Sequence, residues 1–186
     1  LNRVLVDLYT LFPPRRLEDY RLMRLCTSAN SVQKMDKRFN YLIVDDDNGG
    51  DEEDGKKEGS RVTFVFNIYK TVKKYKQQIF DLDSEHADLA RVLRSFVERG
   101  ALKHGDLVFS KSAFRPFENF GYQVARAAKE IIRRPLSCNA FRHAFISYFV
   151  YGDQAVFRTY NAREKVSKKM SHSLSMQIKY VKIGLI

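Results

Sequence analysis

Hydrophobic residues recur every three or four positions in several stretches of the chain, which is the spacing of one buried face of a helix. The first stretch covers residues 4–11, and Pro13-Pro14 should end it because proline has no backbone N–H to donate. Longer helices with the same periodicity are predicted near residues 84–99, 117–131 and 139–150. Asp83 or Ser84 should cap the first of these, and Gly100 should end it.

A shorter helix should follow the two prolines. Glu18 and Asp19 fall in its first turn, where carboxylates suit the positive end of the helix dipole. Leu22, Met23 and Leu25 should anchor it in the core. The loop between the first two helices, which carries Arg15 and Arg16, is therefore expected to lie between two packed elements.

Strands are predicted where β-branched and aromatic residues concentrate, over residues 39–44 and 61–69, with a third near residues 78–82. The intervening segment, residues 45–60, is acidic, contains glycine and lacks apolar residues, which favours a mobile loop. Together the pattern predicts an α+β fold that is mainly helical, with a small antiparallel β-hairpin sheet on one edge. The length, 186 residues, suits one domain over residues 1–186.

Charge changes this picture because the acidic residues are unevenly placed. The chain carries a formal net charge of +11, and residues 45–58 hold eight acids against two lysines, so the other residues carry +17. Such a surface favours a polyanionic partner, and double-stranded DNA is the usual one. Charge alone also fits a merely soluble basic protein.

Other classes of site find little support in the residues. Cys26 and Cys138 lie far apart in apolar or helical contexts, so we expect reduced structural thiols and neither a metal site nor a cofactor. No run of about 18 apolar residues exists, and no signal peptide is recognisable, so an intracellular protein without a membrane partner is expected. The first residue is leucine, which indicates a domain excised from a longer chain.

Several residues carry candidate chemistry in a fixed order along the chain. An arginine with an acid three residues later occurs twice, as Arg15 with Glu18 and as Arg16 with Asp19. Tyr69-Lys70-Thr71 should end a strand. Further on, the helix near residues 139–150 should bury Phe141, Ala144, Phe145 and Tyr148.

The same helix carries Arg142 beside its apolar stripe, and such a placement of a charge needs a reason. Asn139 shares an edge of the helix with Arg142. Met170 to Tyr180 then reads as a loop entering a helix, in which His172 precedes Tyr180 by eight residues.

In that order the set resembles the catalytic domain of tyrosine recombinases, the phage-integrase-like enzymes that break and rejoin DNA. The likeness spans nearly the whole chain. It departs from the family in two places: Asn139 stands where the family has histidine or lysine, and Ser171 replaces the glycine of a Gly-His-Ser loop. The Pro-Pro-Arg-Arg and Tyr-Lys-Thr segments look like those of integrases from large eukaryotic DNA viruses and related mobile elements.

The resemblance implies a catalytic set and a mechanism that needs neither metal nor nucleotide. Tyr180 would attack the phosphate to form a 3′-phosphotyrosyl link, Arg16 and Arg142 would clamp the phosphoryl oxygens, His172 would donate a further hydrogen bond, and Lys70 would protonate the leaving oxygen. The resemblance leaves open whether Arg15 or Arg16 is the first catalytic arginine. We prefer Arg16, because Tyr20, expected to be a buried aromatic residue, then follows the acid. The further candidates for substrate contact are Arg15, Lys73, Lys74, Asn139 and His143, although His143 lies one residue round the helix from Arg142 and suits a structural role.

The family's partners and setting are implied in the same way. A recombinase would act at DNA as a dimer or tetramer, in a host nucleus or viral factory if the chain is viral. Two alternatives stay open. A type IB topoisomerase uses the same five catalytic residues to relax supercoils, although the Pro-Pro-Arg-Arg loop and the early end of the chain argue against this alternative. The other alternative is a DNA-binding relative that keeps the fold but has no catalytic activity.

Overall fold

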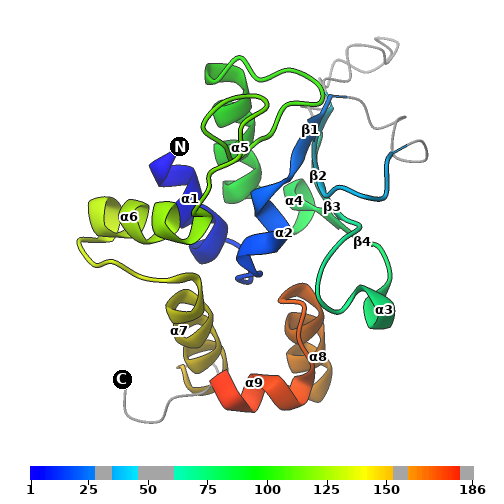
Figure 1. Cartoon of the computed structure of the whole chain (residues 1–186). Coiled ribbons are helices and arrows are strands. Elements are labelled where there is room, and N and C mark those ends of the chain that lie inside the picture. Colours follow the sequence, from blue (N-terminus) through cyan, green and yellow to red (C-terminus); the bar gives the residue numbers. More distant parts are fainter. Residues whose placement is uncertain (28–34, 46–60, 153–158, 181–186) are drawn as a thin grey trace, which may run out of the picture. The chain divides into compact units, whose positions relative to one another are not determined.

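The computed structural model describes residues 1–27, 35–45, 61–152 and 159–180 of the chain (Figure 1). The side chains of Val150, Tyr151, Ile178 and Tyr180 lie outside the described residues, as does nearly all of the acidic segment over residues 45–60. The helices are α1 (Asn2–Thr10), α2 (Leu17–Arg21), α3 (Val72–Tyr75), α4 (Leu82–Glu85), α5 (Ala87–Arg99), α6 (Phe120–Ile132), α7 (Cys138–Tyr151), α8 (Tyr160–Lys169) and α9 (Leu174–Tyr180). The strands are β1 (Arg24–Cys26), β2 (Tyr41–Asp45), β3 (Arg61–Phe66) and β4 (Gln78–Asp81).

These elements form two compact units, each assembled from segments that are distant in sequence. Unit 1 contains residues 1–18, 69–75 and 118–186, and unit 2 contains residues 19–68 and 76–117. The α+β class with a predominance of helix is confirmed. The prediction of one domain over residues 1–186 stays a prediction.

Unit 1 is helical, with α1 packed against α6 and α7, and with α9 packed against α7 and α8 (Figure 1). Tyr9 of α1 stacks on Phe141 of α7 with ring centroids 5.4 Å apart. A second cluster joins Ile146 of α7 to Met170, which follows α8, with Met176 of α9 packed against it. Apolar contacts between α7, α8 and α9 thus hold the C-terminal helices together.

Unit 2 contains a four-stranded sheet in the order β1-β2-β3-β4. The two hairpin pairings, β2 with β3 and β3 with β4, are antiparallel as predicted. The prediction of a purely antiparallel sheet is wrong, because β1 pairs with β2 in parallel, with Leu25 opposite Leu42. The short helix α4 and the long helix α5 pack on β3.

The central strands are buried on both faces, which explains their nearly continuous apolar sequence. On one face, Tyr41, Ile43 and Val65 cluster with Cys26. On the other face, the ring of Tyr20 lies 6.0 Å from each of three phenylalanine rings. These belong to Phe64, Phe66 and Phe109. The predicted burial of Tyr20 is confirmed.

The helices show how far local pattern predicts structure. α1 ends at Thr10, ahead of the two prolines, and α5 ends at Arg99 with Gly100 as its C-cap, both as expected. The predicted cap of the long helix is wrong, because α5 begins only at Ala87 and its N-cap is His86, not Asp83 or Ser84. Asp83 and Ser84 lie within the separate short helix α4, which Asp81 caps. The predicted second helix is wrong in its length, because α2 stops at Arg21.

Beyond α2, Leu22 is 44% exposed and anchors nothing, whereas Met23 is buried as predicted. Leu25 is also buried, but as a residue of β1. The backbone of residues 24–26 pairs with β2. If α2 continued through these residues, this pairing would be lost, so a strand stands where the end of the helix was expected.

The buried face of α7 also differs from the prediction. Phe141 is buried as expected, but Ala144 is exposed and Tyr148 is 70% exposed. The fully buried side chains of the helix include Arg142 and Ile146. A stripe of large apolar residues was therefore a poor guide to the orientation of α7, because the buried guanidinium of Arg142 occupies part of the inward face.

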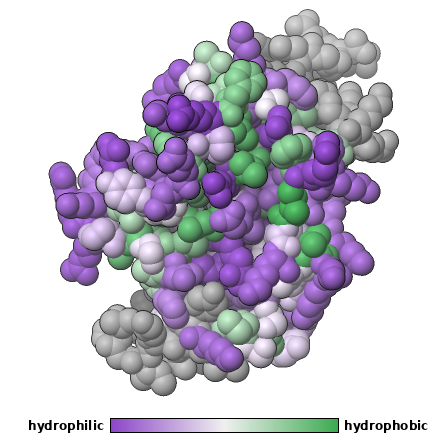
Figure 2. All heavy atoms as spheres, in the orientation of Figure 1, coloured by the Kyte–Doolittle hydropathy of each residue, from purple (hydrophilic) through white to green (hydrophobic). Residues whose placement is uncertain are grey.

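Within the described residues, no helix is both long enough and apolar enough to cross a membrane. On the face shown in Figure 2, hydrophilic residues predominate and hydrophobic ones are scattered between them.

Candidate functional site

The guanidinium of Arg142 joins three segments of unit 1 that lie far apart in the sequence. Its Nη1 donates to the carbonyl oxygen of Pro14 at 2.6 Å, and both terminal nitrogens lie 3.2 Å from the carbonyl oxygen of Met170. Nη2 also lies 3.1 Å from Nδ1 of His172. Arg142 is completely buried, so these protein acceptors satisfy a charge that would otherwise be costly to bury.

This contact decides which nitrogen of His172 carries the proton. A guanidinium only donates hydrogen bonds, so Nδ1 of His172 must accept and the imidazole proton must sit on Nε2. Burial, together with the positive charges of Arg142 and Arg16, lowers the pKa of His172 from its ordinary value of 6.5 to about 3. At neutral pH His172 is therefore a neutral side chain whose Nε2–H is a hydrogen-bond donor.

A Schellman motif at the end of α8 positions His172. The backbone N–H of His172 donates to Ser167 O at 3.0 Å, and that of Ser171 donates to Lys168 O at 3.1 Å. Ser171 has φ of +56°, the left-handed conformation that this motif requires and that glycine adopts most readily. The position where the chain departs from a Gly-His-Ser pattern is thus a position where glycine would be favoured, and serine adopts the same backbone turn.

The two neighbouring arginines, Arg15 and Arg16, differ sharply in their environments. Arg15 is completely buried, and its Nη1 donates to Lys169 O at 2.7 Å. Its guanidinium carbon also lies 5.0 Å from the centre of the Tyr69 ring, within cation–π range. Arg16 is only partly buried, and its charge contributes to lowering the pKa of His172.

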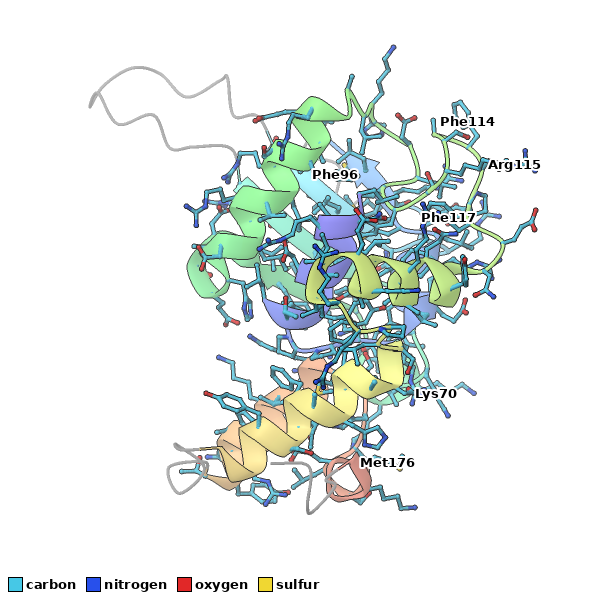
Figure 3. The ribbon with its side chains drawn as sticks, turned by 90° about the vertical axis from the view of Figure 1, so that its left-hand side faces the viewer. Lys70, Phe96, Phe114, Arg115, Phe117 and Met176 are labelled. Atoms are coloured by element: carbon cyan, nitrogen blue, oxygen red, sulfur yellow. The ribbon has the colours of Figure 1, made fainter. Side chains whose placement is uncertain are left out.

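We name residues 69–75 the lysine turn. The prediction that Lys70 ends a strand is wrong. β3 ends at Phe66, so Lys70 does not end a strand and lies in an exposed turn before α3 (Figure 3). Lys73 and Lys74 lie on α3 and are exposed as well. The reason is that residues beyond Phe66 no longer pair with β4, which begins only at Gln78.

Sequence reasoning missed one residue of this turn, Tyr75. Its hydroxyl donates to the backbone carbonyl oxygen of His172 at 3.1 Å. Nζ of Lys74 lies 5.0 Å from the centre of the Tyr75 ring. An aromatic residue within a lysine-rich stretch was the only signal in the sequence, and it does not identify a partner almost a hundred residues away.

The helix that carries Tyr180 is tied to the same region of unit 1. Ser173 caps α9 by accepting from the backbone N–H of Met176 at 3.3 Å. Gln177 is completely buried and makes a reciprocal pair with Arg163 of α8: it accepts from Arg163 Nε at 3.2 Å and donates to Arg163 O at 3.3 Å. Tyr180 is the last residue of α9, two turns after His172, and its side chain lies outside the described residues.

The remaining candidates lie on α7 and α8. Asn139 is exposed in the first turn of α7, and no hydrogen bond among the described residues links it to Arg142 or His172. His143 is half-buried. Tyr160, the nearest other tyrosine to Tyr180 but placed before His172 in the chain, is the first residue of α8 and is 65% exposed. Of the residues predicted from the sequence, Arg15 and Arg142 directly contact the buried loop that contains His172. Arg16 affects His172 through its charge.

Both cysteines are buried free thiols as expected, and Cys138 Sγ lies 3.3 Å from the carbonyl oxygen of Arg15. The described part of the chain contains no group of three or more His, Cys, Asp or Glu residues placed to hold a metal ion. A scan against family models, a search of curated proteins and a search of solved structures each found no match to this chain.

Chemically, the site combines fixed positive charge with a neutral donor. Arg16 and Arg142 supply positive charge beside His172, whose Nε2–H has the chemistry of a hydrogen-bond donor. The exposed lysines of the lysine turn belong to the same unit. Such an arrangement suits the non-bridging oxygens of a phosphodiester, which carry negative charge and accept hydrogen bonds.

Proposed function

We propose that this protein breaks and rejoins DNA strands through a 3′-phosphotyrosyl intermediate, as a site-specific recombinase or integrase. The observation that carries the proposal is the cluster of Arg16, Arg142 and His172, because segments 126 and 30 residues apart converge on one neutral, donating imidazole. A buried histidine whose pKa is lowered by burial and by two neighbouring arginines marks a candidate functional site. The charge of +17 outside the acidic segment favours DNA as the source of the phosphodiester.

In the proposed reaction, the phenol oxygen of Tyr180 attacks phosphorus and gives its proton to solvent water as the new P–O bond forms. The bond from phosphorus to the 5′ oxygen breaks, and Lys70 gives that oxygen a proton. Arg16 and the Nε2–H of His172 would stabilise the charge on the non-bridging oxygens. Attack by a 5′ hydroxyl on the phosphotyrosyl bond reverses these steps and rejoins a strand, so no external energy source is consumed.

The roles of the two arginines near the start follow from their burial. Arg16 is partly exposed, whereas Arg15 is completely buried and donates to Lys169 O. Arg142 is also buried and donates to Pro14 O, Met170 O and His172. We therefore assign phosphate contact to Arg16, and to Arg142 the tasks of setting the tautomer of His172 and supplying positive charge.

The test is capture of the covalent intermediate. The protein is incubated with a pool of duplex oligonucleotides of randomised sequence that carry a nick, so that the short fragment released on cleavage diffuses away and the adduct accumulates. Denaturing electrophoresis and sequencing of the attached DNA would give the preferred site, and mass spectrometry of the digested adduct would give the attached residue. The expected result is a peptide modified at Tyr180.

Two variants make the assignment specific. Tyr180→Phe removes only the phenol oxygen and should abolish the adduct, whereas Tyr160→Phe should leave it at the wild-type level. An adduct that survives in Tyr180→Phe, or that disappears in Tyr160→Phe, would overturn the assignment of the nucleophile. Relaxation of a supercoiled plasmid by the protein without strand exchange between two sites would favour the topoisomerase instead, and DNA binding with no adduct would favour the non-catalytic relative.

A further inference from the structure

The lysine turn begins and ends with a tyrosine, and the first of these is an anchor. Tyr69 is buried, and the guanidinium carbon of Arg15 lies 5.0 Å from the centre of its ring. The same guanidinium donates to Lys169 O at 2.7 Å. Arg15 therefore bridges the start of the lysine turn and the His172 loop, which we define as residues 169–172.

The second anchor lies at the other end of the turn. The hydroxyl of Tyr75 donates to His172 O at 3.1 Å. The two carbonyl oxygens used by the anchors, those of Lys169 and His172, are thus the first and the last of the His172 loop. The lysine turn is tied at both of its ends to both ends of the loop that presents the catalytic imidazole.

Between its anchors the lysine turn is held by its own backbone hydrogen bonds. Val72 N donates to Tyr69 O at 3.1 Å, and the N–H groups of Lys74 and Tyr75 donate to Thr71 O at 3.0 and 3.1 Å. Lys70 is exposed between the two anchors and carries none of these bonds. The backbone beneath Lys70 is therefore fixed, while its side chain is available for a ligand.

We propose that Tyr75 and Arg15 are positioning residues that couple Lys70 to His172, so that the proton donor and the phosphate-binding imidazole keep a constant relation. This inference rests on the proposed function for the role of Lys70, whereas the coupling itself rests on the contacts alone. Lysine has a long and flexible side chain, so proton transfer from Lys70 depends on a well-placed backbone. Loss of one anchor should increase the range of positions that the turn samples.

Tyr75→Phe is the informative variant because it removes a single hydroxyl from a half-buried residue and keeps the ring beneath Lys74. Tyr148→Phe is the matched control, since Tyr148 lies in the same unit and is 70% exposed. Arg15→Lys tests the other anchor, although removal of a buried guanidinium could unfold unit 1. Tyr75→Phe avoids that ambiguity.

Hydrogen–deuterium exchange tests the coupling without reference to activity. In Tyr75→Phe the amides of residues 72–75 and 171–177 should exchange about three to ten times faster, the population change expected from the loss of one neutral hydrogen bond. Exchange in the sheet of unit 2 and in the Tyr148→Phe protein should be unchanged. Exchange at residues 171–177 that matches the wild type would overturn the coupling.

Cleavage kinetics test what the coupling does for Lys70, on the site recovered by adduct capture. Tyr75→Phe should cleave an ordinary substrate roughly three to ten times more slowly than wild type. A substrate with a bridging 5′ sulfur needs little protonation of its leaving group, so the same variant should then lie within about twofold of wild type. An equal defect on both substrates would overturn the link to Lys70. If the wild-type protein forms no adduct, the proposed function fails, and the exchange experiment still decides the coupling.

Discussion

The pKa of His172 leads to a prediction about the pH dependence of stability. Burial, with the positive charges of Arg142 and Arg16, lowers the pKa of His172 from its ordinary value of 6.5 to about 3 in the folded protein. In the unfolded chain this side chain takes up a proton as the pH falls below 6.5, whereas the folded protein excludes the proton until the pH approaches 3. The unfolding free energy should therefore fall as the pH decreases from 6.5 towards 3. Above pH 6.5 the stabilising contribution of the neutral His172 should be fully present.

The size of the effect follows from the width of the shift. Well below pH 6.5, each further pH unit costs about 1.4 kcal/mol of unfolding free energy per histidine held neutral. Between about pH 7.5 and pH 5.0 the loss due to His172 should come to about 2 kcal/mol. That is a large part of the stability of an ordinary small domain.

The matched variant is His172→Gln, because the side-chain oxygen of glutamine can still accept a hydrogen bond from Arg142 but does not titrate. Urea unfolding of both proteins, followed by circular dichroism at several pH values, gives the unfolding free energy at each pH. Wild type should lose about 2 kcal/mol more than the variant over the stated range. Every other titratable group is present in both proteins, so its contribution cancels in this difference.

Two results would refute the reasoning. Equal pH dependence of the two proteins would mean that His172 titrates alike in the folded and unfolded states. A direct measurement by NMR is independent of any unfolding model: the ring protons of His172 should keep their chemical shifts from about pH 8 to pH 5. A titration midpoint near 6.5 would show that Arg142 and burial do not hold the imidazole neutral.

Three further predictions concern other parts of the chain. Ser171→Gly should be about 1 kcal/mol more stable than Ser171→Ala in thermal unfolding, because Ser171 has φ of +56° and both variants lose the same hydroxyl; equal stabilities would contradict the assignment of strain. Asn40→Ala should lower the unfolding free energy, measured by urea unfolding, by about 3 kcal/mol. The buried amide of Asn40 donates to Asp19 O and Ile68 O and accepts from the N–H groups of Asn67 and Ile68, and all four groups would lose their partner. A loss below about 1 kcal/mol would mean that water replaces these bonds. DNA affinity measured by fluorescence anisotropy should fall steeply between low and high salt, because counterion release accompanies binding by a chain with this charge; unchanged affinity would exclude backbone phosphates as the main contact.

Features that depend on neighbouring residues could be predicted from the sequence. Pro13-Pro14 ends the first helix for a reason internal to proline, and the apolar period of α5 runs to its cap at Gly100. The choice of Arg142 as a functional candidate also came from a local contradiction, a charge beside an apolar stripe. Predictions of this kind use only nearby residues and do not require knowing which distant segments come into contact.

Features that depend on distant segments could not be predicted in this way. Leu25 belongs to a strand only because β2 offers its backbone a parallel partner, and helical spacing alone had assigned it to α2. Arg142 points inward on α7 only because Pro14 O, Met170 O and His172 supply acceptors there, so Ala144 and Tyr148 face outward.

The same limit applies to the candidate site. The sequence favoured Arg16 over Arg15 as the first arginine but left both open. Only the tertiary contacts of Arg15 with Lys169 and Tyr69 distinguish a buried bridge from a partly exposed arginine. The sequence could not identify the partner of Tyr75, because that partner is the backbone carbonyl of His172, and every residue has such a carbonyl. Local pattern selects residue types, whereas burial and hydrogen-bond partners are decided where the chain folds back on itself.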